Sequence, residues 1–132
     1  MVANARKYIK LCSSSIKDLK EKIPYEAKIE RMLLSYCKAN YYEAKTEFRK
    51  AKKYALETLR LATELKQETY ITKSLMFLFY TNMKLQYKDD AFEYIWKLFP
   101  LSQYVEGRFA RNYKRFLKMY EPVIKDHIQE EL

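Results

Sequence analysis

The chain has 132 residues, of which 48% are hydrophobic and 33% are charged, and lysine plus arginine exceed aspartate plus glutamate by nine. This composition is too hydrophobic for a disordered chain, and a domain of this length buries enough surface to fold without disulfides or metals. Glycine occurs once, at Gly107, which excludes the glycine-rich loops that hold phosphates and dinucleotides. We therefore expect a single domain over residues 1–132.

The amino terminus and the cysteines indicate the compartment. Charged residues begin at Arg6, without the apolar run of a secretory signal. The longest apolar run, residues 75–80, is far shorter than the roughly 20 residues of a membrane-spanning helix. Cys12 and Cys37 fall within helical patterns, where free thiols are favoured over a bridge. We expect no membrane span and, by default, a cytoplasmic protein.

Apolar residues at intervals of three and four predict helices throughout the first half. Residues 3–23 carry one such stripe, and Pro24 both ends that helix and can open the next. Residues 25–67 contain no glycine or proline, and we predict two helices that meet near residues 38–40 rather than one long helix. The second of these helices carries a heptad seam of mostly small residues over 41–65, which predicts close packing.

The second half predicts three more helices. Residues 69–87 are apolar on almost every face, so this helix must be central or must give one face to another subunit. A short helix over 89–98 and a loop at 101–107 follow. The last helix spans 108–120, after which Pro122 either kinks it or begins an acidic tail. With no strand pattern, we expect an all-α fold of five to seven helices, either an antiparallel helical bundle or stacked helical hairpins.

Positive charge is concentrated in the first half of the chain and on two helical faces. Residues 1–66 carry 16 Lys and Arg against 8 Asp and Glu, whereas residues 67–132 carry 10 against 9. Four cations share one arc of the third helix, and five cations of the last helix occur in a stretch without any acid. These candidate nucleic-acid contacts are Lys45, Arg49, Lys53 and Arg60, and then Arg108, Arg111, Lys114, Arg115 and Lys118.

Such clusters attract nucleic acid because neutralising phosphates releases bound counterions, which gives affinity without base recognition. No recognition-helix or zinc-finger pattern is present, so we predict non-specific contact, with double-stranded DNA as the expected form. The competing interpretation is a solvated face whose lysines pair with nearby glutamates. The 13 tyrosines could stack on bases, but most fall on apolar stripes and are predicted to be core residues.

The groups that catalysis requires are missing from the sequence. His127 is the only histidine and has no cysteine or second histidine at metal-ligand spacing. Either cysteine would need this distant histidine as its base. The paired acids Asp89 and Asp90 are better explained as helix caps. We therefore predict a protein that is not an enzyme and that carries no metal or cofactor.

As a whole, the chain resembles the short, basic, tyrosine-rich helical coat proteins of hyperthermophilic archaeal viruses of filamentous or spindle-shaped form. The resemblance lies in residues 5–10, in the small-residue seam of 41–65 and in the basic aromatic segment 108–116. It implies a structural subunit that self-associates beside or around DNA, and therefore a virion location. The acidic carboxyl terminus and the lack of a long basic amino-terminal arm depart from a protein that wraps DNA.

A second resemblance implies a different function. Two sets of residues match the second-helix spacing of tetratricopeptide repeats, whereas Glu43 and Thr46 depart from the first-helix pattern. The matching residues are Ala55, Leu59 and Ala62, and then Ala91, Ile95 and Leu98. This resemblance implies an adaptor that grips a partner protein or peptide in a concave groove, and stacked hairpins would favour it. A regulator with an internal pocket for a small apolar ligand is a third interpretation.

Overall fold

The computed structural model describes residues 4–11, 24–98, 100–101 and 107–131, and the regular structure within these ranges is helical. Residues 4–11 form a helical segment. The longer helices are α2 Pro24–Ala44, α3 Phe48–Glu64, α4 Glu68–Lys84, α5 Lys88–Leu98 and α6 Gly107–Glu131. The predicted all-α fold is confirmed. The rest of the predicted first helix and most of the predicted loop lie outside the described residues.

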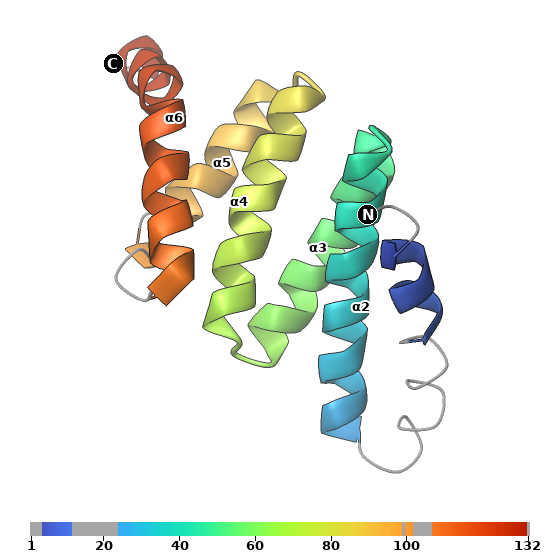
Figure 1. Cartoon of the computed structure of the whole chain (residues 1–132). Helices are drawn as coiled ribbons and strands as arrows, with labels where there is room; N and C mark the ends of the chain where they lie inside the picture. The colour runs from blue at the N-terminus through green and yellow to red at the C-terminus, as the bar shows by residue number, and fades with distance from the viewer. Residues whose placement is uncertain (1–3, 12–23, 99, 102–106, 132) are drawn as a thin grey trace.

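The helices alternate between two layers (Figure 1). Consecutive helices run antiparallel, so α2, α4 and α6 run parallel in one layer while α3 and α5 lie behind them. In this arrangement α3 packs against α2 and α4, and α4 packs against α3 and α5. The segment 4–11 flanks α2, where Ile9 contacts Leu34. The expected antiparallel helical bundle is therefore confirmed, and its consecutive helices are arranged as a row of hairpins.

Three turns of the same backbone geometry set this alternation. Each contains one residue in the left-handed region, at Thr46 (φ 60°), Lys66 (φ 55°) and Gln86 (φ 65°). In each turn the following residue donates its N–H to the carbonyl five positions earlier, at 2.9 Å. This is the Schellman arrangement, which satisfies the free carbonyls of a helix end and reverses the chain. Because the turns are evenly spaced, α3 and α4 both have 17 residues.

The predicted break near residues 38–40 is wrong. α2 is continuous through this segment, and Ala39 is completely buried against Ala55 and Leu78. The chain turns instead at residues 45–47, between α2 and α3. This turn is hard to find in the sequence because its left-handed position, Thr46, carries threonine instead of glycine. The prediction that Pro24 opens a helix is confirmed.

α4 holds the central position that its apolar faces predict. Leu75 and Phe79 pack into a cluster with α5 and α6, while Leu78 packs against α2 and α3. All three side chains are at most 2% exposed. The turn divides the predicted small-residue seam of 41–65: its α3 positions Ala51, Ala55, Thr58 and Ala62 are buried, whereas Ala44 is exposed at the end of α2. Small side chains on this face allow α3 to lie close to its neighbours.

α6 continues through Pro122 to Glu131. Beyond the proline, Ile124 and His127 are buried, and the His127 ring stacks on Phe92 with centroids 3.7 Å apart. These contacts with α5 offset the helical hydrogen bond that proline removes. Figure 1 shows the helix axis turning in this last part, as the predicted kink requires. The residues after Pro122 are therefore the packed end of α6 instead of a separate tail.

We expect glycine at the left-handed positions to stabilise the fold. A non-glycine residue in this conformation costs the folded state roughly 1–2 kcal/mol. Glycine avoids that cost, and the extra conformational entropy that it loses on folding costs only about 0.5–1 kcal/mol. Thr46→Gly or Gln86→Gly should therefore raise the free energy of unfolding by about 0.5–1 kcal/mol, measured by urea denaturation.

The matched control is Glu93→Gly, at an exposed position inside α5. This variant should lower the free energy of unfolding by about 1 kcal/mol, because glycine disfavours a helix interior. Turn variants that lose as much stability as this control would contradict the left-handed geometry of the turns.

Candidate functional site

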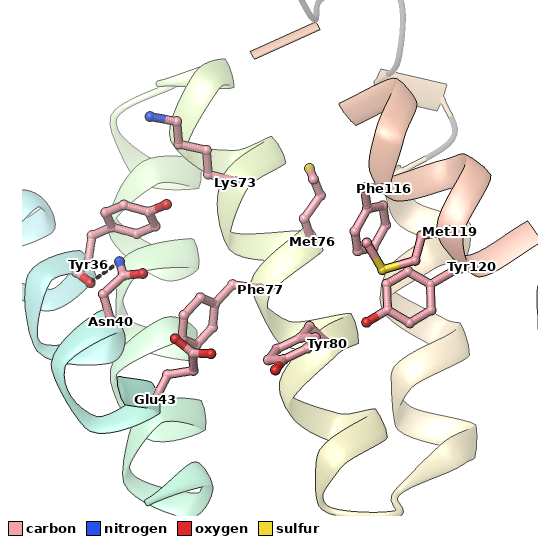
Figure 2. A pocket seen from close by; sticks show the side chains of 10 residues that line it. All are labelled: Tyr36, Asn40, Glu43, Lys73, Met76, Phe77, Tyr80, Phe116, Met119 and Tyr120. Carbon is pink, nitrogen blue, oxygen red and sulfur yellow. Dashed lines mark hydrogen bonds between the residues drawn. The ribbon is translucent and has the colours of Figure 1, made fainter. Parts of the chain in front are cut away.

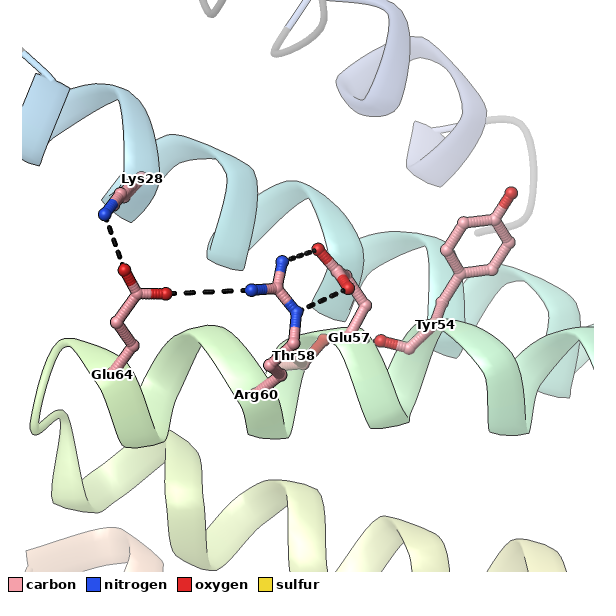
Figure 3. A network of polar contacts seen from close by, with 6 residues as sticks. All are labelled: Lys28, Tyr54, Glu57, Thr58, Arg60 and Glu64. Atoms are coloured by element: carbon pink, nitrogen blue, oxygen red, sulfur yellow. Dashed lines mark hydrogen bonds and ion pairs between the residues drawn. The ribbon is translucent and has the colours of Figure 1, made fainter.

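The predicted third-helix stripe is divided between two environments. Lys45 lies in the turn before α3 and not on the helix itself. At the other end, Arg60 donates hydrogen bonds of 3.1 and 2.6 Å to Glu57 and lies 3.7 Å from Glu64. Because Glu64 also pairs with Lys28 of α2, these side chains form the network in Figure 3. The bonds from Arg60 lower the pKa of the Glu57 carboxyl. Arg60 thus already has carboxylate partners.

The other cations of this stripe lie in or beside a cluster of lysines and tyrosines where α2 meets α3. Lys53 lies over the ring of Tyr54, 5.6 Å from its centroid. Lys45 lies 5.3 Å from the centroid of Tyr41. Arg49 is exposed on the same helix as Lys53. Such cation–π contacts hold the ammonium groups near the rings without removing their charge.

Two lysines that sequence reasoning missed complete this cluster. Lys38 of α2 lies 5.3 Å from the centroid of Tyr54, and Lys50 lies 5.3 Å from that of Tyr42. Tyr42 and Tyr54 stack with centroids 5.5 Å apart and planes 7° apart. Tyr42 is half-buried in this stack. The adjacent tyrosines at 41–42 were a signal, but their partner on α3 depends on the position of the turn.

The basic face predicted for the last helix lies at the surface of α6. Its described cations, Arg111, Lys114, Arg115 and Lys118, are all exposed. Within the described part of the chain, none of them pairs with a carboxylate. The side chain of Arg108 lies outside the described residues. On the opposite face of the helix, Phe116, Leu117 and Tyr120 pack against the core.

A groove crosses the layer formed by α2, α4 and α6 (Figure 2). Its volume is about 480 Å³. In Figure 2 the side chains of α2 and α6 point toward each other over α4. The lining residues are Tyr36, Asn40 and Glu43 from α2, Lys73, Met76, Phe77 and Tyr80 from α4, and Phe116, Met119 and Tyr120 from α6. Met119 is 69% exposed, so the groove is open on its α6 side.

Two lysines lie at the two ends of the α4 face that lines the groove. The ammonium group of Lys73 lies 5.7 and 5.1 Å from the ring centroids of Tyr36 and Tyr70. Lys84 lies one turn beyond Tyr80 and 5.3 Å from its ring. The centre of the groove between these lysines is aromatic and apolar. Sequence reasoning interpreted these aromatic residues as core, although the excess apolar faces of α4 were a signal of the groove.

The described residues can also be searched for reactive groups. They contain no group of three histidines, cysteines or acids that could hold a metal ion. Cys37 is a half-buried thiol, and the His127 ring stacks on Phe92. Among the described helices, none has the length and apolar character needed to cross a bilayer. The groove and the exposed basic surfaces are candidate binding sites on the described residues.

No protein-family model, curated protein or solved structure matches the chain. The functional argument therefore rests on the groove and the charged surfaces, and the two resemblances drawn from the sequence stay predictions.

The phenol of Tyr36 should titrate above its ordinary pKa of 10.0, because burial raises this pKa. The unfolded chain then releases this proton at a lower pH than the folded chain, so stability should fall as the pH rises above 10.0. Phenolate absorbance of the native protein, minus that of the Tyr36→Phe variant, isolates this titration. A midpoint at or below the ordinary value would contradict the burial of Tyr36 in the groove wall.

Proposed function

We propose that this chain is a helical-repeat adaptor that binds a short segment of another polypeptide in the groove across α2, α4 and α6. The groove itself carries the proposal, because three distant parts of the sequence line one open aromatic surface. Aromatic side chains and methionine are enriched in protein interfaces, and an unbranched methionine adapts to different apolar partners.

The residues that resemble tetratricopeptide repeats support the same proposal. Their spacing is that of second helices, and they lie on α3 and α5, which are the second helices of the two hairpins. Ala55 and Ala62 on α3 are at most 1% exposed, and Ala91, Ile95 and Leu98 on α5 are completely buried. In this arrangement the second helices supply the packing between hairpins, while the first helices α2 and α4 line the groove.

The floor of the groove favours large apolar side chains flanked by carboxylates. Phe77 and Tyr80 occupy the centre of the α4 face. Lys73 and Lys84 lie at its two ends. Among the described residues that line the groove, Glu43 is the single acid. An apolar anchor at the centre and an acidic residue near either lysine would complement this surface.

The rim of the groove on the α6 side favours the same acidic ligand. Arg115 lies about 40° around the helix from Met119, at 3.6 residues per turn. Arg111 and Lys118 follow on the same exposed face. None of these cations has a carboxylate partner among the described residues. The first of them, Arg115, lies beside Met119 on the open side of the groove. The occupant that we infer is therefore a short acidic segment with aromatic or aliphatic anchors.

The virion function predicted from the sequence is a second candidate. The observation that favours it is the exposed basic face of α6, which is available to the phosphates of DNA as well as to a peptide. Self-association and DNA binding are predictions that the groove does not require.

Selection of a phage-displayed random peptide library on the wild-type chain should enrich sequences that combine acids with aromatic or leucine anchors. Met119→Glu should weaken the enriched peptides by roughly tenfold or more, because it places a carboxylate at the rim facing an acidic ligand. Met119→Lys should weaken them by less than about threefold. Fluorescence anisotropy of the synthesised peptides measures both affinities.

Leu56→Glu is the matched control, because Leu56 is an exposed apolar residue of α3 outside the groove. It should leave peptide affinity unchanged. Equal losses for this control and Met119→Glu, or enrichment of basic peptides, would refute the proposed ligand. A dimer that Met119→Glu alone dissociates would identify a second copy of the chain as the occupant and overturn the peptide proposal.

A further inference from the structure

We propose that the cluster of lysines and tyrosines between α2 and α3 is a separate surface that binds the phosphate backbone of nucleic acid. The cluster shares no residue with the lining of the groove. Its cations are distributed over α2, α3 and the turn between them. The members are Lys38, Lys45, Lys50 and Lys53 with Tyr41, Tyr42 and Tyr54.

α2 separates this surface from the peptide groove. At 3.6 residues per turn, Lys38 lies about 160° around α2 from Tyr36, which lines the groove. Tyr36 contacts Tyr70 of α4, with ring centroids 5.5 Å apart. Lys38 instead reaches Tyr54 of α3. A ligand on the lysine–tyrosine cluster therefore leaves the groove free.

The four lysines retain their positive charge for an external anion. Three are exposed, Lys38 is half-buried, and in the described part of the chain none of them pairs with a carboxylate. Glu57, the next acid along α3, is held by Arg60 at 2.6 Å. Glu43 lines the groove on the other side of α2. Only Glu47, exposed in the turn, opposes the four cations within this segment of the sequence.

The tyrosine rings favour contact with phosphates over contact with bases. Tyr54 has Lys38 and Lys53 within 5.6 Å of its centroid and is also stacked on Tyr42. Tyr42 has Lys50 near its ring. Rings with these contacts have little face left for a base, but they restrict the lysine side chains. A restricted lysine loses less conformational entropy when it binds an anion. We therefore expect binding without base preference.

The helical segment 4–11 extends the same surface. Ile9 contacts Leu34 of α2, which lies one turn before Lys38. This contact holds the segment beside α2, and Arg6 and Lys7 are exposed on it. The segment therefore adds exposed positive charge beside α2.

The test uses fluorescein-labelled DNA duplexes of about 20 base pairs, in two unrelated sequences, with anisotropy measured between about 50 and 200 mM salt. The wild-type chain should bind both duplexes equally, with an affinity that falls linearly on a log–log plot against salt. The variant Lys38→Gln/Lys50→Gln/Lys53→Gln should reduce the steepness of this log–log salt dependence by about 2–3. It should also reduce the affinity at low salt by at least about tenfold. The corresponding triple arginine variant should retain binding.

The matched control is Lys88→Gln/Lys97→Gln/Lys125→Gln, which removes the same charge from exposed positions on α5 and α6. It should change affinity by less than about threefold, because salt screens distant charges. Equal losses in both glutamine variants would mean that net charge alone binds DNA, and would overturn the proposal. Absence of binding by the wild type would overturn it as well.

Two further results would assign the binding elsewhere. Loss of DNA binding only in Arg111→Gln/Arg115→Gln/Lys118→Gln would place the contact on α6 and refute the cluster. Binding of anionic lipid vesicles without binding of duplexes would replace nucleic acid with a membrane surface.

If the triple lysine variant does not fold, Lys45→Gln/Lys50→Gln, at exposed positions, carries the same test with a slope change of about 1–2. Peptide affinity measured on the cluster variants should be unchanged, so failure here and failure of the groove proposal are distinguishable.

Discussion

The layered arrangement of this protein depends on how the chain reverses direction after α2, α3 and α4. Each reversal places one residue in the left-handed region and connects the next N–H to a carbonyl of the preceding helix. Because the reversal is the same at positions 46, 66 and 86, each helix returns antiparallel to the one before it. α2 and α4 therefore share one layer and one direction, and α6 continues that layer. The groove exists because these three helices are neighbours in space.

α4 links the core to the groove. One part of its surface carries Leu75, Leu78 and Phe79 into clusters with the neighbouring helices. The remaining apolar side chains, among them Phe77 and Tyr80, line the groove. A helix that is apolar on nearly every face is normally buried on every face. Here the unburied part of that surface is the part to which we assign a ligand.

Lysine and tyrosine have related roles on both sides of α2. In the groove, Lys73 lies over two tyrosine rings at one end of an apolar floor. On the opposite side, Lys38 lies over Tyr54 in a cluster without a compensating network of acids. Ring contacts orient the ammonium groups but leave their charge in place, whereas the carboxylates around Arg60 neutralise it. Which cations are available to a ligand is thus decided by the partner beside each side chain.

The sequence by itself determined the helical class, the start of α2 at Pro24, the buried seam of α3 and the central place of α4. These features follow from local periodicity and from the geometry of proline, which do not depend on distant residues. Only the tertiary structure decided the turn at Thr46, the course of α6 past Pro122, the pairing of Lys28 with Glu64 and the groove itself. The turn has no glycine to mark it, the end of α6 depends on packing against α5, and Glu64 pairs both Arg60 and a lysine of another helix. The groove is lined by side chains of three helices. The residues within one helix do not specify which helices lie beside it, and the reversals between helices bring these three together.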